Sequence, residues 1–228
     1  MKSFEKLCAN SILICMVLVA MGPIIIAGWL PPLSANMDAQ ELKSIFVRDH
    51  FAILVAMTLC GLSGMFYTLF GSAISTVIER MSPHHKSLAR VQFTMAAGTG
   101  IVISLVGFLG LALAFRTDID AEVLRFGADL WFLTFVGWYC PALWQFVTIS
   151  WAVFSDSEQK FYPRWVGYLN MWVALSLAPG LYMAFFHDGP FAWHGILGFW
   201  LIALGFFGWS SVMWRMTVKA LNNLDERG

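Results

Sequence analysis

Charged residues are scarce in this chain of 228 residues, where they make up 12% of the sequence against 59% hydrophobic residues. This leaves too little polar surface to cover a water-soluble globule of this size. Lys and Arg balance Asp and Glu at 14 each, so no excess positive charge favours nucleic acid as a partner. The composition therefore indicates an integral membrane protein whose first partner is the lipid bilayer.

Cysteine pairs and metal-binding motifs are also missing. The four cysteines, Cys8, Cys15, Cys60 and Cys140, lie in or beside apolar runs, and none forms a CxxC motif. The sequence contains neither HExxH nor a histidine box of the di-iron type. We therefore expect small packing cysteines and no metal site, and no motif points to a particular cofactor.

Alternating β-barrel patterning is absent, because runs such as GIVISLVGFLGLALAF are apolar at consecutive positions. About 20 residues of helix cross a hydrocarbon core of roughly 30 Å, and six apolar runs are long enough. The expected spans are residues 11–33, 51–78, 91–115, 130–154, 165–186 and 191–214. We predict an all-α fold, a single domain over residues 1–228 that forms a polytopic bundle of six transmembrane helices.

The distribution of Lys and Arg predicts the orientation of this bundle. An N-terminus in the cytoplasm places ten of the fourteen cations on the cytoplasmic side and leaves Lys43, Arg48, Arg116 and Arg125 outside. Both termini are thus expected in the cytoplasm. The first run follows Lys2 and Lys6 as a signal peptide would, but its length and the lack of a cleavage site favour a retained anchor.

The two longest connections are both expected outside, at about residues 36–50 and 117–129. In the first, Ser34, Asn36 or Asp38 can cap a short helix in the membrane interface. The second repeats the pattern with apolar residues from Ile119 to Phe126. Together the two segments would cover the outer end of the bundle.

Small residues and prolines predict how the spans pack. Glycines recur seven residues apart in three spans, as Gly64 and Gly71, Gly100 and Gly107, and Gly198 and Gly205. Such seams let helices approach closely, so spans 2, 3 and 6 are expected to be neighbours. Three prolines, Pro23, Pro141 and Pro179, are expected within helices, where each removes one backbone hydrogen bond.

Several His and Asp residues at the span ends lie near the outer boundary in this topology, namely Asp49, His50, Asp129, His187, Asp188 and His194. Imidazole and carboxylate groups together can perform acid–base chemistry, so the candidate catalytic residues are His194, Asp129, His50 and His187. A structural interpretation of the stretch HDGPFAWHG is favoured over this one. In it Asp188 caps the last helix, Gly189 forms the turn, Pro190 starts the helix and Trp193 anchors it in the headgroup zone.

Tryptophan is unusually frequent, with eleven residues, several of them spaced seven apart. The aromatic belts of a membrane account for the tryptophans near span ends, namely Trp29, Trp131, Trp151, Trp165, Trp193 and Trp214. The remaining tryptophans are deeper, where lipid tails offer the indole N–H no acceptor. We expect those to face protein or ligand.

An aromatic pocket with a few polar groups would collect these deep residues. Its candidate ligand-binding residues are Trp138, Trp144, Gln145, Tyr67, Tyr139, Asn170, Trp172 and Trp200. Such a pocket suits a sterol, an isoprenoid, a quinone or an acyl chain. Packing of the bundle alone explains the same aromatic residues equally well.

The segments AQELKSIFVRDH, YPRWVGYLNMWVALSLAPG and HDGPFAWHGILGFW resemble those of a group of uncharacterised bacterial multi-pass membrane proteins. The resemblance covers most of the chain. It implies a six-helix protein of the bacterial cytoplasmic (inner) membrane, and it implies no activity.

Three functions follow from these observations. The first is an intramembrane pocket for a lipophilic small molecule, with isomerisation or cyclisation as the chemistry if the outer His and Asp residues converge. The second is a non-enzymatic accessory or scaffold subunit that packs against partner helices or against another copy of the chain. The third is a permease for an uncharged solute, because the spans hold no Asp, Glu, Lys or Arg that could couple transport to ions.

Overall fold

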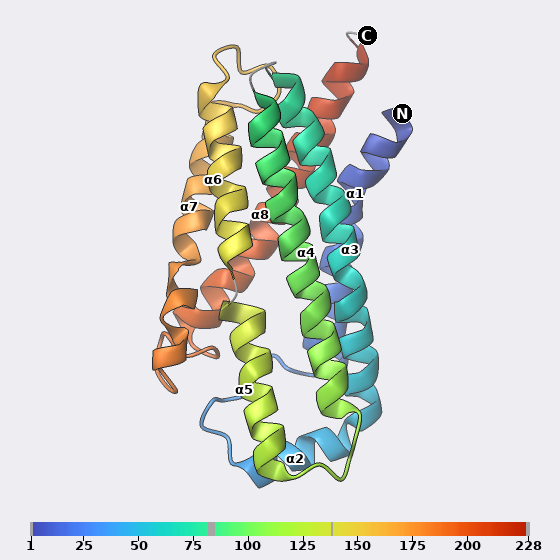
Figure 1. The fold of residues 1–228 in the computed structure, drawn as a ribbon, viewed down its shortest axis with the longest axis vertical. Coiled ribbons are helices and arrows are strands. Elements are labelled where there is room, and N and C mark those ends of the chain that lie inside the picture. The colour runs from blue at the N-terminus through green and yellow to red at the C-terminus, as the bar shows by residue number, and fades with distance from the viewer. Residues whose placement is uncertain (1, 82–84, 138, 227–228) are drawn as a thin grey trace.

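A computed structural model describes residues 2–81, 85–137 and 139–226 of the chain (Figure 1). This part of the chain is all-helical and contains no β-strand. The α-helices are α1 (Lys2–Val19), α2 (Ala39–Arg48), α3 (His50–Met81), α4 (Lys86–Ala114), α5 (Ala121–Gly137), α6 (Cys140–Ser155), α7 (Arg164–Ser176) and α8 (Leu201–Glu226). Shorter π and 3-10 segments are η1 (Ala20–Ile26), η3 (Ala178–Leu181), η4 (Met183–Phe185) and η5 (Ile196–Trp200).

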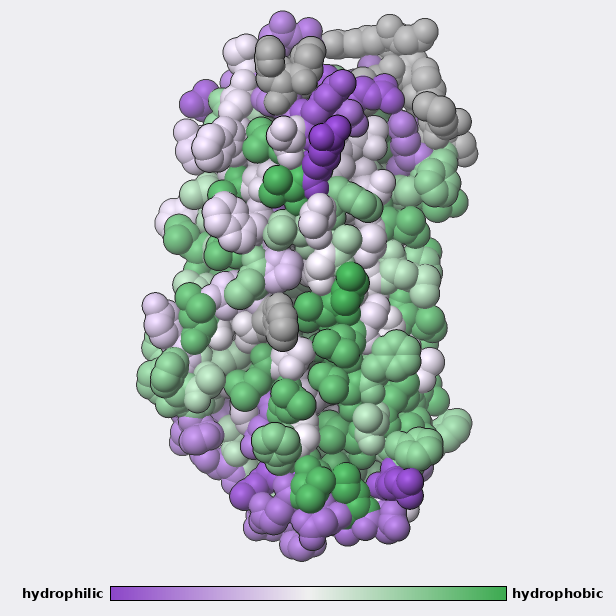
Figure 2. Space-filling view, viewed as in Figure 1, coloured by the Kyte–Doolittle hydropathy of each residue, from purple (hydrophilic) through white to green (hydrophobic). Residues whose placement is uncertain are grey.

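Six helical segments of the described chain are long and apolar enough to cross a membrane. They are Phe4–Ile26, His50–Met81, Lys86–Ala114, Ala121–Ser155, Arg164–Phe185 and Ile196–Asn223. Figure 2 shows hydrophobic residues across the middle of the face in view, with hydrophilic residues toward both ends. The predicted all-α bundle with six candidate spans is confirmed.

The bounds of the first, fourth and last spans differ most from those expected. The fourth begins at Ala121 instead of residue 130. The first ends at Ile26 instead of residue 33, because Gly28 then adopts a positive φ of 68° that turns the chain out of the helix. The last begins at Ile196 instead of residue 191. The residues before it form a hairpin, in which Gly189 has a φ of 79°.

The chain enters and leaves the bundle at the same end of the molecule (Figure 1). The same end holds the connections from α3 to α4 and from α6 to α7, and with them Arg80, Lys86, Lys160 and Arg164. The opposite end holds α2 and the connection from α4 to α5. Most of the cations thus gather at one end of the bundle.

The two expected outer segments take different forms. Asp38 caps α2 by accepting hydrogen bonds from the backbone N–H groups of Gln40 at 2.9 Å and Glu41 at 3.4 Å. The second segment is no separate helix, because α5 starts at Ala121 and runs without interruption to Gly137. Asp120 caps this longer helix.

The longest uninterrupted helices, α3 and α4, pack along the predicted glycine seam. A Cβ atom on Gly64 would overlap the carbonyl oxygen of Gly100, and one on Gly107 would overlap the backbone of Gly61. The two backbones therefore touch, which confirms spans 2 and 3 as neighbours. The expectation for span 6 is confirmed only for its contact with span 2: α8 packs on α3, where Tyr67 stacks on Phe206 at a ring distance of 6.3 Å. Its glycines do not make this contact, because Gly198 packs on Ala192 within its own segment and Gly205 contacts α7.

The buried apolar residues form two clusters, one toward each end of the bundle. The first joins α1, α3, α6, α7 and α8 around Phe70, Phe146 and Trp209. The second joins α2, α3, α4 and α5 around Phe46, Trp131 and Phe132. The bundle thus has two packed halves that meet in its middle.

We expect Gly107→Ala to lower the free energy of unfolding by about 1–3 kcal/mol, because the added methyl group forces the backbones of α3 and α4 apart. Gly208→Ala in α8 is the matched control: nothing lies within 4 Å of its Cβ position, and Ala favours a helix. Unfolding in mixed micelles measures both variants. Equal stability of the two would contradict the close seam.

Candidate ligand-binding cavity

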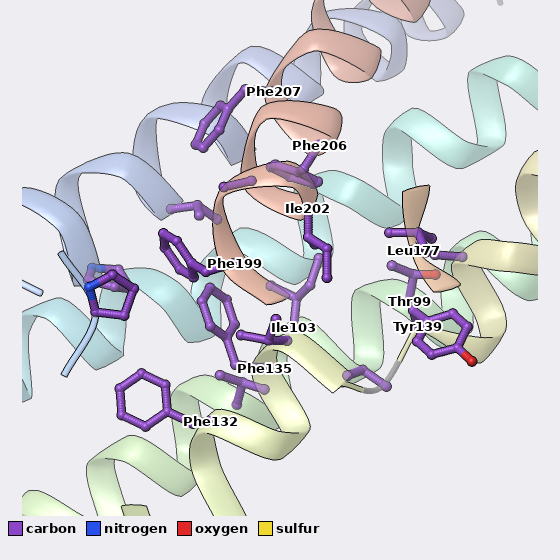
Figure 3. A pocket seen from close by; sticks show the side chains of 18 of the residues that line it. Thr99, Ile103, Phe132, Phe135, Tyr139, Leu177, Phe199, Ile202, Phe206 and Phe207 are labelled. Atoms are coloured by element: carbon purple, nitrogen blue, oxygen red, sulfur yellow. The ribbon is translucent and has the colours of Figure 1, made fainter. Parts of the chain in front are cut away.

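A cavity of about 170 Å³ lies where the two apolar clusters meet. Figure 3 shows Phe135, Phe199 and Ile103 gathered around this space from α5, η5 and α4. The cavity is lined by Val19, Pro23, Ile24, Trp29, Pro32, Tyr67, Thr99, Val102, Ile103, Val106, Trp131, Phe132, Phe135, Val136, Tyr139, Ala142, Phe146, Val173, Leu177, Phe199, Ile202, Ala203, Phe206 and Phe207.

The cavity coincides with the interruptions of four of the six spans. Pro23 lies in η1, where the first span changes from α to π geometry, and Phe199 lies in η5, which precedes α8. Tyr139 lies between α5 and α6, and Leu177 directly follows α7. Only α3 and α4 pass the cavity as continuous helices in the described chain.

The prolines explain part of this pattern. Pro23 lies inside η1, as a proline within a helix was expected to, but the other two expectations are wrong. Pro141 occupies the first turn of α6, and Pro179 lies in η3 beyond the end of α7. Proline lacks an N–H and is tolerated in a first turn, so the helix restarts there instead of continuing.

The walls are aromatic and aliphatic. The described lining residues include no His, Asp, Glu, Lys, Arg or Cys. Their polar atoms are the hydroxyl groups of Tyr67, Thr99 and Tyr139 and the indole N–H groups of Trp29 and Trp131. The Thr99 hydroxyl donates to the Met95 carbonyl at 3.0 Å, and the Trp131 N–H donates to the Val106 carbonyl at 2.9 Å. The cavity therefore suits an uncharged, lipophilic group.

One polar pair lies directly behind the wall. The Tyr67 hydroxyl donates to Oε1 of Gln145 at 3.0 Å, and both side chains are buried. The amide nitrogen of Gln145 has no hydrogen-bond partner among the residues that the structure describes. This pair holds the Tyr67 ring against the cavity.

The predicted ligand-binding residues separate into three sets. Tyr67 and Tyr139 line the cavity, and Gln145 is one hydrogen bond away from it. Asn170 is fully buried but lies elsewhere in the core, where its Oδ1 accepts from the indole N–H of Trp209 at 2.8 Å. Trp138 lies outside the described residues.

The other three predicted tryptophans point away from the cavity. Trp144 and Trp172 are 59% and 72% exposed, and Trp200 is partly exposed beside Leu201 and Leu204. In their place the wall uses residues that the sequence analysis assigned to a membrane belt. Trp29 and Trp131 are only 5% and 2% exposed and line the cavity. The seven-residue spacing showed which tryptophans share one face of a helix, but not whether that face points toward the cavity or toward lipid.

The four candidate catalytic residues form no single cluster among the described residues. Nε2 of His194 lies 3.9 Å from Oδ1 of Asp188, and its Nδ1 accepts from the backbone N–H of Ala35 at 3.3 Å. Asp129 lies close enough to His187 for their charges to interact. None of the described groups of His, Cys, Asp and Glu has three members placed to hold a metal ion.

His50 lies apart from these residues, in a small pocket that Lys43 and Arg116 also line. Next to it, the Arg48 guanidinium donates to both oxygens of Asp49, at 3.0 Å and 2.6 Å. These hydrogen bonds hold the pKa of the Asp49 carboxyl below its usual range. None of the four candidate catalytic residues lines the cavity.

The hairpin between spans 5 and 6 follows its structural interpretation only at Gly189, whose positive φ forms the turn. Pro190 does not start the last helix, which begins at Ile196. Asp188 accepts from the backbone N–H of Gly189 at 2.7 Å, so it closes the turn and does not cap a helix. Trp193 is buried, stacks on Phe132 at a ring distance of 5.3 Å, and donates to the Leu33 carbonyl at 3.0 Å. The hairpin is thus tied to the chain between η1 and α2.

We expect Tyr67→Phe to lower the free energy of unfolding by about 1–3 kcal/mol, because both polar ends of the buried Gln145 amide then lack partners. Combining Tyr67→Phe with Gln145→Leu should restore part of the loss, since it removes both polar groups. Thermal unfolding in detergent compares the variants. A double variant less stable than Tyr67→Phe alone would contradict this pairing.

Comparison of the chain with models of protein families, with curated proteins and with solved structures finds no match. The resemblance to a bacterial membrane-protein group therefore stays a prediction from the sequence. The geometry of the cavity carries the functional argument.

Proposed function

We propose that this protein binds a lipophilic small molecule within the membrane, in the cavity between its two packed halves. The supporting observation is the cavity itself: its walls are aromatic and aliphatic, and four of the six spans interrupt their α-helices beside it. Broken helices within a bilayer are tolerated where they line a cavity.

The size of the cavity narrows the class of ligand. An engineered cavity of about 150 Å³ binds benzene, so a cavity of about 170 Å³ suits one or two rings or a short apolar chain. A quinone ring, an isoprene segment or part of an acyl chain fits this size better than the four fused rings of a sterol. The proposal is restricted to binding, because the described lining residues offer no acid or base besides two tyrosines.

The proposal places the protein in the bacterial cytoplasmic membrane, with both termini in the cytoplasm. The end of the bundle that holds the termini also holds Arg80, Lys86, Lys160 and Arg164. Cations accumulate on the cytoplasmic side of membrane proteins. The bacterial location follows the resemblance of the sequence.

A second candidate function, an accessory subunit of a membrane complex, is favoured by the exposed tryptophans of α6 and α7. Trp144 and Trp172 lie well inside their helices and project outward. Lipid tails provide no acceptor for an indole N–H, whereas a partner helix does. This function is compatible with a bound ligand.

We expect Ile103→Trp to fill the cavity and abolish retention of a lipophilic molecule by the purified protein. Ile103 lines the cavity from α4. Ile101→Trp on the same helix is the matched control, because Ile101 is 68% exposed and outside the cavity. Native mass spectrometry and lipid extraction measure what each variant retains. Equal retention by both variants, or none by the unaltered protein, would contradict the proposal.

If the accessory function is correct, a photo-crosslinking residue at Tyr168 of α7 should yield one protein adduct of defined size in native membranes. Tyr168 is exposed and lies one helical turn before Trp172 in α7. The same crosslinker at the exposed Leu105 of α4 should label lipid only. Replacing both Trp144 and Trp172 by Leu should remove the adduct. Protein adducts from both positions alike would count against a dedicated α6–α7 face.

A further inference from the structure

Among the buried tryptophans of the described chain, the indole N–H of Trp29 lacks a hydrogen-bond acceptor. Trp131 donates to the Val106 carbonyl, Trp193 to the Leu33 carbonyl, and Trp209 to Asn170, at 2.9, 3.0 and 2.8 Å. Trp29 is equally buried, but its Nε1 has no acceptor among the described residues. Trp29 also lines the cavity, as Trp131 does.

The Trp29 ring is held in place from several sides. Its ring centroid lies 5.1 Å from Trp131 in an edge-to-face contact, and 5.8 Å and 5.9 Å from Phe46 and Phe132. Its backbone N–H donates to the Pro23 carbonyl at 3.0 Å. The side chain is therefore fixed by packing and not by its polar atom. The structure thus leaves the buried N–H of this cavity-lining tryptophan without an acceptor among the described residues.

A buried donor without an acceptor destabilises the fold, and the neighbouring tryptophans show that the fold readily supplies acceptors. We propose that the ligand supplies this acceptor, as a neutral carbonyl oxygen on a small apolar ring. An anionic carboxylate is disfavoured, because none of the described lining residues is a cation. The inference rests on the proposed binding function and selects a quinone-type ring over a plain hydrocarbon chain.

Two probes of similar shape test this inference. Duroquinone carries two carbonyl oxygens on a tetramethylated ring, and durene is the tetramethylated hydrocarbon without them. All ring carbons of duroquinone are substituted, so duroquinone does not add to the exposed Cys140 thiol. Binding to protein in nanodiscs is measured by equilibrium dialysis, with the Ile103→Trp variant as the reference for partition into lipid.

We expect Trp29→Phe to weaken duroquinone binding about tenfold, which corresponds to roughly 1.4 kcal/mol, and to leave durene binding nearly unchanged. Phe keeps the aromatic contacts and removes only the donor with part of the ring. Trp172→Phe is the matched control, because Trp172 is outside the cavity, and it should change neither probe. In the unaltered protein, duroquinone should also move the ¹H resonance of the Trp29 indole N–H downfield, which tests the bond without a variant.

The outcomes separate the two proposals. If both probes bind, Ile103→Trp blocks both, Trp29→Phe affects neither and the indole resonance does not move, then the acceptor inference is wrong and the binding function stands. If neither probe binds above the Ile103→Trp reference, both proposals are wrong. Selective loss of duroquinone in Trp29→Phe, together with the resonance shift, supports both.

Discussion

The direct backbone contact between α3 and α4 is the constraint on which the rest of the bundle depends. Gly64, Gly100 and Gly107 allow this approach, because a Cβ atom at any of the three would overlap the opposite helix. The pair forms a continuous wall through both packed halves, and α1 packs on α3 while α5 and α6 pack on α4. Because these helices pack against two continuous helices, their own α-helical hydrogen bonds can be interrupted while the bundle stays folded.

The interruptions keep their backbone groups paired locally, as a membrane interior requires. In η1 the Gly22 carbonyl accepts from Ala27 at 3.1 Å, and beyond α7 the Leu177 carbonyl accepts from Gly180 at 3.0 Å. Each change of helix geometry redirects side chains such as Pro23 and Leu177 toward one space. The cavity is thus a consequence of where the helices break. Few polar groups surround it, and none of the described lining residues is charged.

Much of the fold was predictable from local signals. The length of the apolar runs predicted six candidate spans, and the spacing of glycines in spans 2 and 3 predicted their contact. The capping residues Ser34, Asn36 and Asp38 predicted α2, and the structure selects Asp38. Of the cavity, Tyr67 and Tyr139 were predicted as lining residues, whereas Trp29, Trp131 and Phe199 were not. Position along a span indicates depth, but the direction of a side chain depends on the neighbouring helix. Trp29 and Trp131 were therefore expected at the lipid boundary, and Trp144 and Trp172 inside.

The sequence by itself determined that the chain is helical, how many times it can cross a bilayer and which two helices touch, because these properties follow from hydrophobic length and from the absence of Cβ atoms. Only the tertiary structure decided which tryptophans turn inward, where the prolines end helices, and that His194, Asp129 and His50 lie apart from the cavity. Those outcomes depend on how distant segments pack, as when Trp193 finds its acceptor in Leu33, 160 residues away along the chain.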